Sequence, residues 1–99
     1  MVKHIVLWNF KADLTDEERE DAGELVKTTL EALKSQIKGI SSLEVKINDM
    51  SGSTKDIALI SKFTSIDALN AYQVHPLHVE AGKYIKAVTQ DRECFDYEM

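Results

Sequence analysis

Residues 2–10 read VKHIVLWNF, and this stretch decides the fold. In an extended strand, successive side chains point to opposite faces of the sheet. A strand with water on one side alternates cleanly between apolar and polar residues, whereas here both faces are apolar in the middle. We therefore predict a strand covered on both sides. One face carries His4, Val6, Trp8 and Phe10, and the other carries Lys3, Ile5, Leu7 and Asn9.

A long amphipathic helix is predicted to follow. Thr15 and Glu18 have the spacing of a capping box, in which each residue satisfies a backbone N–H of the other. Apolar residues then recur at helical spacing, and Gly39 marks the stop. The predicted buried positions are Ala22, Leu25, Val26, Thr29, Leu30, Leu33 and Ile37.

The remaining elements complete a β-α-β-β-α-β order. We expect strands over residues 43–47, 56–63 and 92–98. A short helix capped by Ser65 should run through Gln73, and a new helix should start at His75 or Pro76 and continue over residues 77–88. This order is that of an α+β, ferredoxin-like fold with its helices on one face of a four-stranded antiparallel sheet. At 99 residues the chain is one domain, residues 1–99.

The face of this sheet away from the helices is apolar but has nothing in the chain to cover it. Ile5 and Leu7 lie there with Ala58 and Ile60. A second copy stacked face to face by a two-fold axis is the simplest cover. We therefore predict a homodimer in which two sheets form a barrel.

Composition excludes several partners. The net charge is −5, which argues against nucleic acid and gives no attraction to anionic lipid. No stretch approaches the roughly 20 apolar residues of a membrane span, so we expect a cytoplasmic protein. Cys94 is the single cysteine, which rules out an internal disulfide, and we expect it to be a small core residue. We expect no cofactor and no metal, because the residues show no ligand pattern for either.

The stretch Tyr72–His78 holds the residues best suited to chemistry. His78 and Tyr72 are candidate catalytic residues, because an imidazole moves protons near neutral pH and a phenol holds an oxygen that is gaining charge. His4 and Trp8 share the strand face that meets the helices, so we expect them to bind a ligand in the same interior. The alternative is an ordinary helix break, in which His75 caps a helix beginning at Pro76 and His78 is structural.

Three segments resemble the Dabb family of stress-responsive dimeric A/B barrels, in the dimeric α/β-barrel superfamily. They are residues 2–11, the His-Pro-x-His block within 72–82, and the last strand, 92–98. The resemblance implies this fold and a homodimer, and the acidic sequence is most similar to bacterial members. One plant member, olivetolic acid cyclase, performs a cofactor-free intramolecular aldol condensation. Its base and tyrosine match His78 and Tyr72, and a further histidine matches His4. Another pocket histidine corresponds to Ile57, so the resemblance implies that Ile57 also contacts the ligand, in a pocket that differs.

Three functions stay open on this reading. The first is a dimeric domain of the stress-responsive type that binds a small apolar or keto ligand. The second is a cofactor-free cyclase or lyase acting on a β-keto substrate, with His78 as base and Tyr72 as donor to the developing oxyanion. The third is an oxygenase or haem-degrading relative, for which no haem-binding histidine can be identified.

Overall fold

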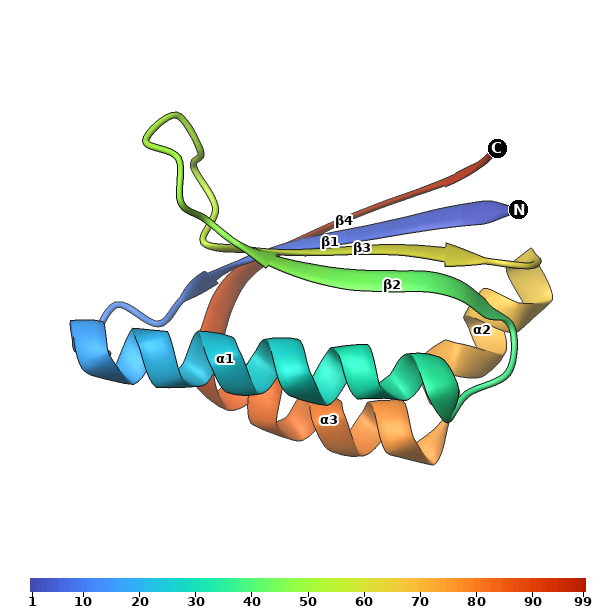
Figure 1. Ribbon diagram of the computed structural model, residues 1–99, viewed down its shortest axis with the longest axis horizontal. Coiled ribbons are helices and arrows are strands. Elements are labelled where there is room, and N and C mark those ends of the chain that lie inside the picture. Colours follow the sequence, from blue (N-terminus) through green and yellow to red (C-terminus); the bar gives the residue numbers. More distant parts are fainter.

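The computed structural model describes all 99 residues and contains a single four-stranded antiparallel sheet in the order β2-β3-β1-β4. This is the predicted ferredoxin-like α+β fold (Figure 1). The elements are β1 (Val2–Phe10), α1 (Asp16–Ala32), a short 3₁₀ helix η1 (Leu33–Ser35), β2 (Ile40–Ile47), β3 (Ile57–Phe63), α2 (Ile66–Val74), α3 (Pro76–Val88) and β4 (Thr89–Glu98).

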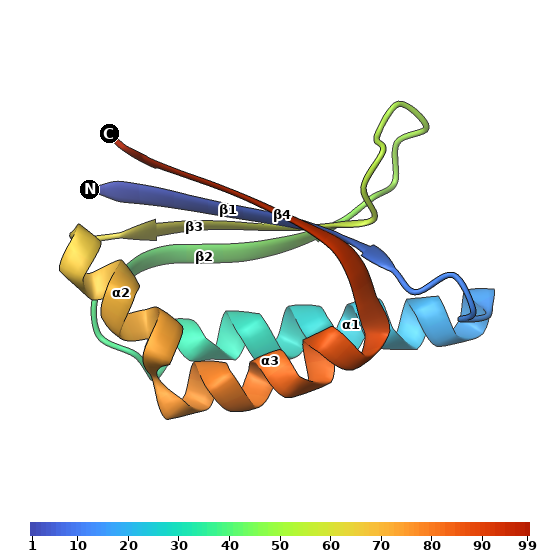
Figure 2. The same cartoon turned by 180° about the vertical axis from the view of Figure 1, so that it is seen from behind.

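All three α-helices lie on one side of the sheet, and the other side carries none (Figures 1 and 2). The alternating burial of β1 and β3 follows from this arrangement, because their helix-facing residues are buried and the others are half-buried. The core lies between the sheet and α1 and α3, and Val26, Val45 and Phe63 in it are fully buried. No helix here has both the length and the apolar character that crossing a membrane requires.

The start of α1 is as predicted, but its end is not. Thr15 Oγ1 accepts from the Glu18 amide at 3.1 Å, and Glu18 accepts in return from the Thr15 amide at 2.9 Å. The α-helix ends at Ala32 and tightens into η1, well before Gly39. The predicted core residue Leu25 is wrong, since it is 47% exposed on the solvent side of α1.

Gly39 serves the turn into β2 instead of capping a helix. Its φ is +89°, a conformation that glycine adopts without strain. A Cβ built at this position would lie 2.6 Å from the Cβ of Ala68. The turn therefore requires glycine for two reasons, its backbone conformation and its contact with α2.

β2 begins at Ile40, three residues before the predicted start at Leu43. β4 likewise begins at Thr89, three residues before the predicted start at Arg92. Its pairing with β1 shifts register between Leu7 and Asn9, and Asp91 there has a φ of 57°. Cys94 is exposed on this edge strand, so the prediction of a core cysteine is wrong. An edge strand has a neighbour on one side, which leaves its side chains less covered than those of β1.

Candidate active site between sheet and helices

The break between α2 and α3 positions the two candidate catalytic residues. The His75 side chain accepts from the Leu77 amide at 3.1 Å, and Pro76 is the first residue of α3. His75 is therefore a helix cap, as the helix-break reading predicted. The change of direction brings His78, on the first turn of α3, against Tyr72, near the end of α2: their ring centroids are 4.3 Å apart.

Tyr72 is fully buried, and its hydroxyl has no hydrogen-bond partner. Its ring packs 4.9 Å from that of Phe63 and 6.4 Å from that of His4, measured between centroids. Burial raises the pKa of Tyr72 to about 12, because the phenolate would be poorly solvated there. The phenol thus stays protonated over the neutral range and keeps one donor free.

His78 is half-buried, and its Nδ1 lies 3.1 Å from the carbonyl oxygen of Gln73. A carbonyl oxygen accepts only, so Nδ1 must carry the hydrogen of this bond. In the neutral ring, Nε2 is then the nitrogen with a free lone pair. Burial lowers the pKa of His78, against the opposing effect of the Gln73 bond, and nearby positive charge from His4 and Arg92 adds to the lowering. The ring is therefore a neutral base at pH 7.

A cavity of about 340 Å³ lies between the sheet and the helices and brings three of the five predicted site residues together. His4 and Trp8 line it from β1, and His78 lines it from α3. Its remaining walls combine apolar side chains with a few polar ones, as ligand pockets do. They are Val6, Leu30, Leu59, Gln73, Gly82, Ile85, Lys86 and Arg92.

Tyr72 and Ile57 do not line this cavity. Tyr72 contacts the rings of both lining histidines, which places it behind the cavity wall. Ile57 is buried on β3 and borders instead a wider hollow of about 630 Å³ beside the loop between β2 and β3. That hollow has no histidine or tyrosine in its lining, so we place the site at the smaller cavity.

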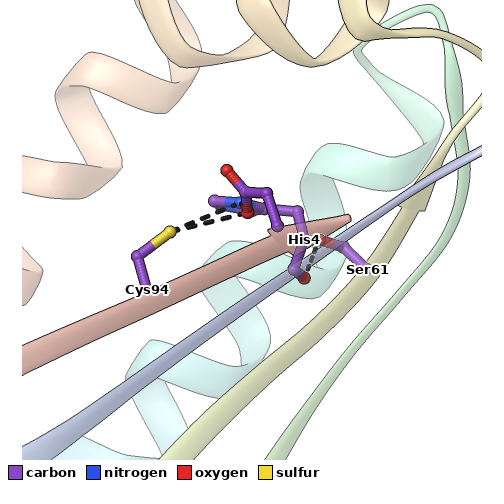
Figure 3. A network of polar contacts seen from close by, with 4 residues as sticks. His4, Ser61 and Cys94 are labelled. Atoms are coloured by element: carbon purple, nitrogen blue, oxygen red, sulfur yellow. Dashed lines mark hydrogen bonds and ion pairs between the residues drawn. The ribbon is translucent and has the colours of Figure 1, made fainter. Parts of the chain in front are cut away.

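His4 also belongs to a polar cluster that the sequence reasoning missed. Its Nδ1 is 2.5 Å from Asp96 Oδ1 and 3.8 Å from Cys94 Sγ, and the thiol donates to Asp96 Oδ1 at 3.5 Å. Figure 3 shows the sulfur directed at the His4 ring, while Ser61 Oγ donates to the His4 carbonyl at 2.8 Å. Burial raises the pKa of Cys94, and the Asp96 charge adds to it. The sequence did contain a signal for this cluster, because Cys94 and Asp96 are two residues apart and so lie on one face of a strand, and that strand pairs with the one that carries His4.

These features define a small α+β domain with a histidine-lined internal cavity. The chain belongs to the Dabb family, because the family model for the Stress responsive A/B Barrel Domain matches residues 2–99 of its sequence. A search of the curated proteins found no match.

Solved structures share this fold. A dimeric ferredoxin-like protein of unknown function from Bacteroides fragilis is 40% identical, with a TM-score of 0.92 over 99% of this chain and 95% of that chain. A dimeric ferredoxin-like protein of unknown function from Thermobifida fusca is 24% identical, with a TM-score of 0.84 over 99% and 90%. A hydroxynitrile lyase from Passiflora edulis is 16% identical, with a TM-score of 0.74 over 97% and 90%, and shares the fold alone.

Proposed function

We propose that this protein is a homodimeric Dabb domain that binds a small, largely apolar ligand carrying a carbonyl group in the cavity between sheet and helices. The observation that carries the proposal is the cavity itself, whose apolar walls hold the rings of His4 and His78. The buried Tyr72 hydroxyl behind these rings supports it, because a buried donor without a partner is costly unless something accepts from it. A carbonyl oxygen of the ligand would be that acceptor once the half-buried His78 ring moves aside.

The proposed dimer uses the sheet face that bears no helix. Phe95 and Tyr97 are 65% and 43% exposed, and their rings pack together with centroids 5.9 Å apart. Phe95 is the cross-strand partner of Ile5, so both lie on this face. An apolar strip of this kind is typical of an interface, and the related proteins from Bacteroides fragilis and Thermobifida fusca are described as dimeric.

A second candidate function is cofactor-free enolisation chemistry of the cyclase type. The specific observation is the 3.1 Å contact between His78 Nδ1 and the Gln73 carbonyl oxygen, which requires a hydrogen on Nδ1 and leaves the Nε2 lone pair free to take a proton. A proton between two carbonyls is acidic enough for a base of this strength. The carbon acid would lose that proton to Nε2, and Tyr72 O–H would donate to the enolate oxygen once the His78 ring, carrying the proton, moves aside.

The β-diketone benzoylacetone tests both functions as a probe. Backbone NMR shifts on titration should map to the residues that line the cavity, and His78→Ala should weaken binding. Shifts confined to the outer sheet face would refute the pocket. Exchange of the diketone's central protons for deuterium tests the chemistry, since a positioned histidine base contributes about 10²–10⁴-fold. If the His78→Ala variant catalyses this exchange at the same rate as the parent protein, His78 is not the base, and the binding proposal is unaffected.

A further inference from the structure

The cluster of His4, Cys94 and Asp96 has a chemistry that the proposed pocket does not use. Imidazole nitrogen, thiol sulfur and carboxylate oxygen are the three ligand types of protein zinc sites. All three ligand atoms lie within 4.8 Å of one another. The pairing of β1 with β4 builds this convergence, because His4 is opposite Asp96 and Val6 is opposite Cys94, on the face toward the helices.

We propose that His4 Nδ1, Cys94 Sγ and an oxygen of Asp96 form a binding site for a divalent transition-metal ion, Zn²⁺ by its ligand types. Zinc–ligand bonds of about 2.0–2.3 Å at tetrahedral angles place sulfur about 3.6 Å from each of the other two ligands, and nitrogen about 3.3 Å from oxygen. The observed separations of sulfur are 3.8 Å from the nitrogen and 3.5 Å from the oxygen. Both match the expected value closely.

The third separation shows what binding would change. Nδ1 and Oδ1 are 2.5 Å apart, which is the distance of a short hydrogen bond and is too short for two ligands of one metal ion. Opening it by about 0.8 Å would reach the tetrahedral distance. The carboxylate can supply this movement, since the Asp96 side chain is 38% exposed while that of His4 is 4% exposed. One ligand is thus held rigidly by the core, and the other two stand on an exposed edge strand where an ion can arrive.

The competing explanation is a simple carboxylate–histidine pair, in which Asp96 only orients the imidazole. It accounts for Cys94 only as a second donor to the carboxylate, although the sulfur also lies 3.8 Å from the ring nitrogen that the carboxylate contacts. In a nucleophilic cysteine–histidine–carboxylate triad, the thiol and the carboxylate would engage opposite ring nitrogens. Convergence of both groups on one nitrogen is what a shared metal ion requires. Three protein ligands would leave one tetrahedral position for water or a ligand oxygen, as in catalytic zinc sites.

The test uses untagged protein of residues 1–99, with Co²⁺ and Zn²⁺ as the probes and no organic ligand. Co²⁺ should bind one ion per chain and give the near-ultraviolet thiolate-to-cobalt absorption band, which Zn²⁺ then displaces. Outer-shell changes at metal sites cost about 10–100-fold in affinity, so Cys94→Ser should lose at least about 100-fold together with the band. Asp96→Asn should weaken binding in the same direction.

Controls separate this site from general surface binding and from the pocket. Glu93→Gln removes a carboxylate on the opposite face of β4 and should change nothing. Cys94 is exposed on an edge strand, so the Cys94→Ser variant should fold, and far-ultraviolet circular dichroism checks this. Absence of the thiolate band, or equal affinity in Cys94→Ser and the parent, would overturn the site. Either result would leave the pocket proposal standing, because the pocket is tested through His78 without metal.

Discussion

Replacing Tyr72 with phenylalanine tests whether a buried hydroxyl is kept at a cost in stability. The hydroxyl is fully buried without a partner, and an unsatisfied buried polar group costs about 1–3 kcal/mol. Its removal leaves a void of roughly 10–20 Å³, which at about 24 cal/mol per Å³ costs about 0.2–0.5 kcal/mol. The substitution should therefore stabilise the fold by about 1 kcal/mol, or about 4–8 °C in Tm for a domain of this size.

The assay is urea unfolding followed by circular dichroism at one fixed protein concentration, because self-association adds to apparent stability. Tyr84→Phe is the matched control: Tyr84 is half-buried, and its hydroxyl is not among the buried unsatisfied groups, so the change should be within about 0.5 kcal/mol. If Tyr72→Phe instead destabilises by more than about 1 kcal/mol, the hydroxyl has a partner in solution and the reasoning fails.

The same variant should lose affinity for benzoylacetone even though it is more stable. A hydrogen bond to a neutral carbonyl contributes about 0.5–1.5 kcal/mol, so the Kd should rise about 2- to 12-fold. Opposite signs for stability and binding would mark a group retained for function. Unchanged affinity would show that the ligand does not reach Tyr72, and His78 would then be the last polar group on its path.

Three further predictions follow from the fold and the site. Gly39→Ala should lower the free energy of unfolding in urea by about 1–3 kcal/mol, because Gly39 has a positive φ and an added Cβ would overlap with Ala68. Gly52 has open space around it, so Gly52→Ala should be near neutral, and an equal loss of stability in the two variants would contradict this reasoning. Phe95→Glu should convert the proposed dimer to a monomer in light scattering, and a persistent dimer would place the interface on another surface. The rate of diketone exchange should fall with decreasing pH at a midpoint below the ordinary histidine pKa of about 6.5, because burial lowers the pKa of His78 and the base stays neutral to lower pH. We call this fall the acid limb of the pH profile; a midpoint above about 6.5 would exclude His78 as the base.

The order and type of the elements and the helix starts were predicted well from the sequence, because their signals are local. The Thr15 capping box and the proline after His75 each fix a helix start through groups within a few residues. Helix ends and exposure were harder to predict. Leu25 fits the helical period, yet it lies beyond the side of α1 that the sheet covers. The early start of β4 depends on pairing with β1, which no local pattern reveals.

The candidate site was partly predictable for the same reason. Alternation along β1 places His4 and Trp8 on the helix-facing side, and the helix break places His78 opposite them. The position of Tyr72 behind the wall depends on how α2 packs, which is a tertiary property. The cluster at Asp96 required the register between the first and last strands, separated by nearly the whole chain.

His4 connects the pocket and the cluster, and its geometry restricts how the two can act together. Its Nδ1 is engaged by the Asp96 carboxylate or by the proposed metal ion, so Nε2 alone remains for the cavity. Bound metal would lock the ring and add positive charge beside the pocket, which disfavours protonation of His78 further. Zinc should therefore shift the acid limb of exchange downward in the parent protein and leave it unmoved in Cys94→Ser. A shift of equal size in both proteins would mean that zinc acts somewhere other than the His4 cluster.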